Sequence, residues 1–66
     1  MSNRDYVIDF IKRNKLSKAE FAKILGLSVS TVNHWDRGIR NVPELVKRVL
    51  LFFDDSGIDI KTFYVE

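Results

Sequence analysis

The segment SVSTVNHWDR, residues 28–37, gathers hydroxyl, amide, imidazole and guanidinium groups within ten residues. Two apolar residues, Val32 and Trp35, interrupt it at helical spacing. Hydroxyl and amide side chains can both donate and accept hydrogen bonds, so they can match the donor and acceptor pattern of another molecule. We therefore interpret this segment as a recognition surface carried by a helix.

Catalytic and metal chemistry have less support in the sequence. His34 is the single histidine and the chain has no cysteine, so a multi-histidine or thiolate metal site within one chain is excluded. Asp54 and Asp55 directly precede Ser-Gly, and we interpret them as a polar helix end rather than as paired catalytic carboxylates. No serine has a histidine and a carboxylate at a recognisable nucleophile spacing, and the three separated glycines form no phosphate loop. We expect no enzymatic activity, no metal and no cofactor.

Length and charge set further limits. Sixty-six residues form one domain at most, near the lower limit at which a core stabilises a chain unaided. Residues 1–50 carry ten Lys and Arg against five Asp and Glu, whereas residues 51–66 carry one lysine against four acidic residues. A basic body favours a polyanionic partner, although ordinary surface solubility explains the same charges. No apolar run approaches ~20 residues and the N-terminus lacks the plan of a signal peptide, so we expect a cytoplasmic protein.

Capping residues and apolar spacing predict four helices. They cover about residues 3–14, 18–25, 29–37 and 43–56. Ser17 and Glu20 form the S-x-x-E capping box at the start of the second helix, and Gly26 ends it. Ser28 is placed to cap the third helix, and Gly57 to end the fourth. The expected fold is mainly α, a compact bundle of four to five helices.

The C-terminal residues are expected to join two copies of the chain. Ile58 and Ile60 alternate with polar residues, which favours a short strand; a short fifth helix from about Asp59 is the alternative. Because a lone strand leaves its backbone unpaired, we expect it to pair across a dimer. Residues 51–66 are therefore the predicted dimerisation segment. The side chains expected in the interface are Phe52, Phe53, Ile58, Ile60, Phe63 and Tyr64.

The second and third predicted helices are joined by a tight glycine turn. Ala22 lies four residues before Gly26, Val32 six after it and Trp35 nine after it. This spacing resembles the helix-turn-helix of DNA-binding proteins. Together with WDRG followed by VP, it makes residues 15–51 similar to the Cro/CI family, also called XRE-like or lambda-repressor-like.

The resemblance implies a helical domain, usually dimeric, that binds operator DNA and often represses its own promoter. We accordingly expect one DNA-binding domain over residues 1–66, with the helix-turn-helix at 17–37, acting as a homodimer on an inverted repeat. The size suits a small phage Cro-like protein, an antitoxin-like protein or an anti-CRISPR-associated autorepressor, and the sequence does not separate these contexts.

Two sets of candidate DNA contacts follow. The residues that match the family's base-contacting positions are Ser28, Val29, Ser30 and His34. Asn33 lies close enough to join them. The residues expected to contact phosphates are Ser17, Lys18, Thr31, Arg37, Arg40 and Asn41. Alternatives without DNA contact stay open. In these, Val29 is expected to complete the core, and His34 and Asn33 to be solvated. The charges of Lys18, Arg37 and Arg40 are then ordinary solubilising surface charges.

A second function also fits the sequence. The third helix has no Lys, Arg or Gln before Arg37, which leaves little positive charge at its start. A module that keeps the fold but binds another protein through its fourth helix and tail explains this sparse charge. The two hypotheses differ in whether the chain binds DNA.

Overall fold

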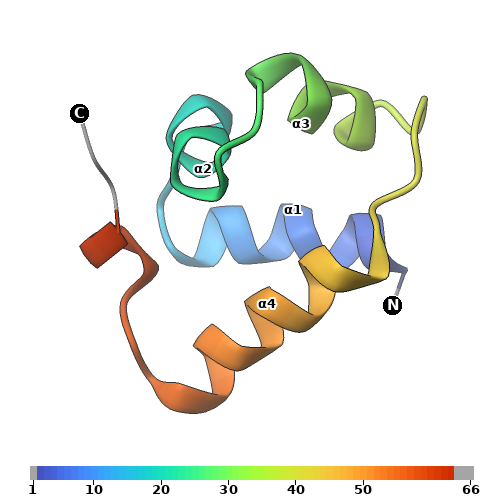
Figure 1. The fold of residues 1–66 in the computed structure, drawn as a ribbon. Coiled ribbons are helices and arrows are strands. Elements are labelled where there is room, and N and C mark those ends of the chain that lie inside the picture. Colours follow the sequence, from blue (N-terminus) through green and yellow to red (C-terminus); the bar gives the residue numbers. More distant parts are fainter. Residues whose placement is uncertain (1, 64–66) are drawn as a thin grey trace.

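A computed structural model describes residues 2–63 (Figure 1). Its elements are α1 (Asn3–Arg13), α2 (Lys18–Leu25), α3 (Val29–Asp36), α4 (Glu44–Ser56) and the 3-10 helix η1 (Ile60–Phe63). In Figure 1, α1 crosses the middle of the molecule, with α2 and α3 on one side of it and α4 on the other. The expected small all-α bundle is confirmed. None of the helices within residues 2–63 is long and apolar enough to cross a membrane.

Serine side chains cap the first three helices. The Ser17 hydroxyl accepts from the Glu20 amide at 3.0 Å, and the Ser17 amide donates to the Glu20 carboxylate at 2.9 Å, so the predicted capping box is confirmed. Ser2 caps α1 and Ser28 caps α3 in the same way, each accepting from the amide three residues on. These bonds satisfy amides that otherwise have no intrahelical partner, and they fix where each helix begins.

A three-residue turn, 26–28, joins α2 to α3. Gly26 has φ +73°, a left-handed conformation that glycine adopts without steric cost. The next amide, that of Leu27, donates to the Ala22 carbonyl at 2.8 Å and closes the end of α2. Only three residues separate the two helices, and α2 and α3 pack directly against each other.

The core lies where the helices meet. Its buried side chains come from all four α-helices, from the connecting segments and from η1: Val7, Phe10, Ile11, Leu16, Phe21, Ala22, Val32, Trp35, Val42, Leu50 and Ile60. The rings of Phe10 and Phe21 are 6.3 Å apart and join α1 to α2 at its centre. α3 is therefore anchored to the body through Val32 and Trp35.

The prediction of a strand at the C-terminus is wrong for residues 60–63, which form η1. A carboxylate oxygen of Asp59 accepts from the Lys61 amide at 3.0 Å, and the Asp59 carbonyl accepts from the Thr62 amide at 3.0 Å, so Asp59 starts a turn. Ile60 is fully buried and η1 packs against α2. Its predicted place in a dimer interface is therefore also wrong. Tyr64 and the rest of the predicted strand lie outside the described residues.

Candidate nucleic-acid interface

α3 lies on the outside of the molecule (Figure 1). Val32 is fully buried and Trp35 is 3% exposed, which confirms that these two side chains turn inward. Ser30 is exposed on the opposite side of the helix. Val29 is 43% exposed, so it belongs to the surface rather than to the core.

The first half of α3 presents two polar side chains that bond to each other and two that are available to a ligand. The Ser28 hydroxyl accepts from the Thr31 amide at 3.2 Å and lies 3.0 Å from the Thr31 hydroxyl, so these two side chains are joined to each other. The side chains of Ser30 and Asn33 form no hydrogen bond within residues 2–63. Ser30 and Asn33 are therefore the side chains best able to meet a ligand without breaking an internal bond.

His34 is partly buried near the end of α3. Its carbonyl accepts from the amides of Ile39 and Arg40, at 2.9 and 3.3 Å, and so holds the loop that follows. Its Nδ1 is buried and has no hydrogen-bond partner among residues 2–63, which leaves Nε2 as the ring nitrogen that can reach a ligand. The backbone at His34 thus holds the loop, and the contact predicted for its side chain stays a prediction.

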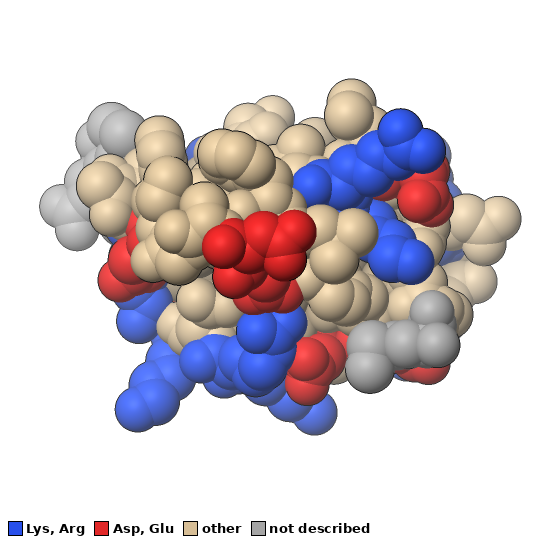
Figure 2. Space-filling model, turned by 90° about the horizontal axis from the view of Figure 1, so that it is seen from below, with Lys and Arg blue, Asp and Glu red and all other residues tan. Residues whose placement is uncertain are grey.

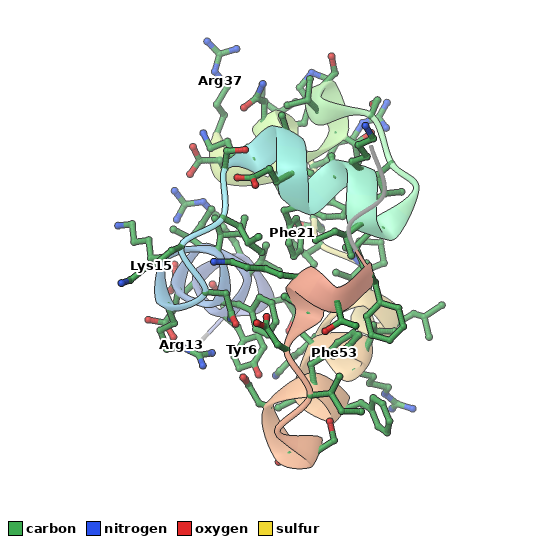
Figure 3. All side chains as sticks on the ribbon, turned by 90° about the vertical axis from the view of Figure 1, so that its left-hand side faces the viewer. Tyr6, Arg13, Lys15, Phe21, Arg37 and Phe53 are labelled. Atoms are coloured by element: carbon green, nitrogen blue, oxygen red, sulfur yellow. The ribbon has the colours of Figure 1, made fainter. Side chains whose placement is uncertain are left out.

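Two of the predicted phosphate-binding cations extend into solvent. Arg37 follows α3 directly and points away from the body (Figure 3). Arg40 is exposed on the following loop, beside Asn41 and at the rim of a hollow of about 250 Å³ that reaches the start of α1. Neither guanidinium forms an ion pair within the described part of the chain.

Lys18 does not extend freely. Its ammonium group pairs with the carboxylate of Asp36, the last residue of α3. Its hydrogen bond is the main reason that the pKa of Asp36 lies below the ordinary carboxyl value. Arg4 of α1 donates from Nε to the Asp36 carbonyl at 2.9 Å, and its Nη2 lies 3.9 Å from an Asp36 carboxylate oxygen. Ser17, just before Lys18, is exposed, with its hydroxyl accepting in the capping box.

Sequence reasoning missed Asp36 and Arg4. Asp36 lies 18 residues from Lys18 and 32 from Arg4, so no periodicity within one helix points to the cluster. Only the steep packing of α3 on α2 and α1 brings the three side chains together. The WDRG motif contained the aspartate, and its position at the end of the third predicted helix was the one available signal.

A second exposed surface is apolar. Leu45, Phe52 and Phe63 are 71%, 60% and 52% exposed, and the partly buried Phe53 connects the aromatic members. Its ring lies 6.0 Å from that of Phe52 and 5.5 Å from that of Phe63, both edge-to-face. We call these four residues the α4 surface. Figure 2, from the α4 side, shows broad uncharged areas between groups of charged side chains.

The α4 surface shares three residues with the predicted dimer interface, which stays a prediction. Phe52, Phe53 and Phe63 were expected there, and Ile58 is 44% exposed in the segment between α4 and η1. Leu45 was missed because it stands in the first turn of α4, outside the predicted segment.

Within residues 2–63, no group of three His, Cys, Asp or Glu side chains is arranged to hold a metal ion.

No protein-family model, curated protein or solved structure matches this chain. The function proposed below therefore rests on the geometry of α2, α3 and α4 and on the resemblance in the sequence.

Proposed function

We propose that this protein is a sequence-specific DNA-binding repressor of the cytoplasm, acting as a homodimer on an inverted repeat in its own promoter. The observation that carries the proposal is the orientation of α3. Burial of Val32 and Trp35 holds the helix against the body, and the polar side opposite them stays open. A short helix exposed in this way after a tight turn has the form that enters a major groove.

The exposed side chains suit base recognition. Ser30 can donate to or accept from several bases, and the Asn33 amide has the paired donor and acceptor that match adenine. His34 can donate to a guanine from Nε2, and the Val29 methyl groups can pack on a thymine methyl. The Ser28 hydroxyl is engaged at the cap, so its predicted base contact would use the lone pair or proton left over.

Phosphate contacts would come from the residues that follow α3. Arg37 and Arg40 are exposed and unpaired within the described residues. They follow α3 and would reach the backbone beside the groove, with Asn41 next to them. Such contacts raise affinity for every sequence and make binding depend on salt, because each neutralised phosphate releases a counterion.

The α4 surface supports the homodimer. One short recognition helix gives weak binding, so two linked copies bind better than one. Figure 3 shows α3 at the top and Phe53 lower down, beside α4 and η1, so a partner on the α4 surface would leave α3 uncovered. A twofold dimer would then place two α3 helices in successive major grooves, about 10 bp or a multiple apart.

The test is a binding titration with the DNA upstream of the protein's own gene, against a scrambled duplex of equal length, over a series of salt concentrations. We expect tighter binding to the upstream DNA and a steep loss of affinity with salt. Ser30→Ala and His34→Ala should reduce the discrimination between the duplexes, and Arg40→Gln should weaken binding to both alike. Arg48→Gln, a charge change on α4, is the matched control and should leave binding unchanged.

A protein-interaction module is the second candidate, and one observation favours it. α3 itself carries no Lys or Arg, and the nearby Lys18 is paired with Asp36, so the positive charge around the helix is small. In this case the α4 surface would bind another protein. The absence of any salt-sensitive binding at micromolar protein would favour the module over the repressor.

A further inference from the structure

Asp36 stands where DNA binding needs positive charge. It ends α3, and its carboxylate holds the ammonium group of Lys18 at the first position of α2. From this juxtaposition we infer that Asp36 weakens binding to all DNA sequences alike, because it occupies the Lys18 group that would otherwise contact a phosphate. The inference rests on the proposed function and concerns the regulation of its affinity.

The pair lies at the surface, within reach of a ligand. The Lys18 and Asp36 side chains keep 40% and 30% of their exposure. A phosphate that approached Lys18 would meet the Asp36 carboxylate at nearly the same place. Two like charges a few ångströms apart repel each other, and surface water screens this repulsion only in part. Lys18 would therefore exchange one anion for another on binding, with little net gain.

Asp36 stays charged under the conditions of DNA binding. Lys18 is the main cause of its lowered pKa, and the charges of Arg4 and Lys12 act in the same direction. Protonation therefore does not release Lys18 near neutral pH. The Asp36 carboxylate therefore repels a phosphate throughout the neutral pH range, and does not act as a pH-dependent switch.

The Lys18–Asp36 ion pair is not needed to hold α2 and α3 together. α2 and α3 are already fixed by the buried side chains of Phe21, Val32 and Trp35. Exposed ion pairs add little to stability. Arg4 also holds the end of α3 through the Asp36 backbone carbonyl, a bond that survives a change of the side chain. Removal of the carboxylate should therefore leave the fold intact and change the electrostatics.

The experiment compares DNA binding of the wild type with Asp36→Asn, Lys18→Gln and the double variant, on the upstream and scrambled duplexes, over a salt series. Asp55→Asn is the matched control: it removes one negative charge from an exposed position on α4, far along the chain from Lys18. Circular dichroism melts confirm that each variant is folded.

We expect Asp36→Asn to tighten binding to both duplexes by the same factor, about three- to tenfold at low salt, and to steepen the salt dependence by about one phosphate contact. Asp55→Asn should change the affinity for either duplex by no more than about twofold. In the Lys18→Gln background, Asp36→Asn should tighten binding by a smaller factor than in the wild type, because it then relieves only the direct repulsion between Asp36 and a phosphate.

The inference is overturned if the wild type binds DNA but folded Asp36→Asn binds equally or less well, or gains as much without Lys18. If the wild type binds neither duplex, the proposed function fails, and this inference fails with it. The two failures are distinguished by the wild-type titration alone.

Discussion

The guanidinium of Arg13 faces the carboxylate of Asp54 with both terminal nitrogens, at Nη1–Oδ1 and Nη2–Oδ2 distances of 3.1 Å each. The Tyr6 hydroxyl donates to the same carboxylate, and the Arg13 Nε donates to Asp9 at 2.7 Å. Figure 3 shows Tyr6 and Arg13 on the same side of α1. This network joins α1 to the end of α4, and so holds the helix that carries the α4 surface.

Replacement of Asp54 by Asn should destabilise the protein in a pH-dependent way. Arg13 is the main cause of the lowered pKa of Asp54 in the folded state, so the stabilisation is present above the ordinary value of 3.8 and is lost as the pH falls through the lower folded value. Because the pair is partly exposed, we expect a loss of about 1 kcal/mol at pH 7. Urea unfolding at pH 7 and at pH 2 measures it.

At pH 2 the loss caused by Asp54→Asn should be smaller than at pH 7, because the stabilisation from the ion pair with Arg13 decreases as the pH falls through the lowered pKa of Asp54. Asp55→Asn serves as the control and should cost less than about 0.5 kcal/mol at either pH. An equal loss at both pH values would show that Asp54 acts through shape or neutral hydrogen bonding instead.

Val29 and Val32 provide a matched pair on one helix. Val32 is fully buried and Val29 is 43% exposed, although both have the same side chain. Val32→Ala should cost about 1–3 kcal/mol, a large part of the roughly 3–10 kcal/mol expected for a chain of this length. Val29→Ala should cost less than about 0.5 kcal/mol and affect only DNA binding. Comparable losses from the two would contradict the orientation of α3.

Gly26→Ala tests the turn between α2 and α3. A Cβ at this position would meet no atom within 4 Å, so the cost comes from the left-handed backbone alone. We expect a loss of about 1 kcal/mol in urea unfolding. Gly26→Asn should lose less than Gly26→Ala, since asparagine tolerates this conformation better. The reverse order of the two variants would show that the turn does not keep this geometry.

Phe52→Glu should shift the chain from dimer to monomer in sedimentation experiments, because it places a charge in the α4 surface. Phe52 is 60% exposed, so the folded monomer should tolerate the change. Ile39→Glu is the control: Ile39 is 62% exposed but lies on the loop after α3, and its replacement should leave the oligomeric state unchanged. If Phe52→Glu has the same sedimentation as the wild type, the proposed dimer does not use this surface.

Much of the fold could be predicted from local sequence signals. The serine caps, the capping box at Ser17 and the glycine after α2 are decided within a few residues, and the structure confirms them. The inward placement of Val32 and Trp35 follows from helical spacing, and it is confirmed as well. Such features depend on short-range geometry, which a single sequence specifies well.

The errors arose where long-range packing decided the outcome. The β-favouring residues after Ile58 suggested a strand. In the structure Ile60 is instead buried against α2, and the chain turns at Asp59 into a 3-10 helix. In the same way, the pairing of Lys18 with Asp36 depends on the angle between two helices, which no local pattern encodes. Ile60, which was expected to face a second copy of the chain, therefore completes the core of the monomer.

The central claim is that the outer side of α3 binds DNA. An NMR titration of isotopically labelled protein with the duplex from upstream of its gene tests this claim most directly. We expect the largest shifts on residues 28–34 and at the start of α2, and smaller shifts on α4. Shifts confined to α4 and η1, or none at all at high DNA concentration, would contradict it.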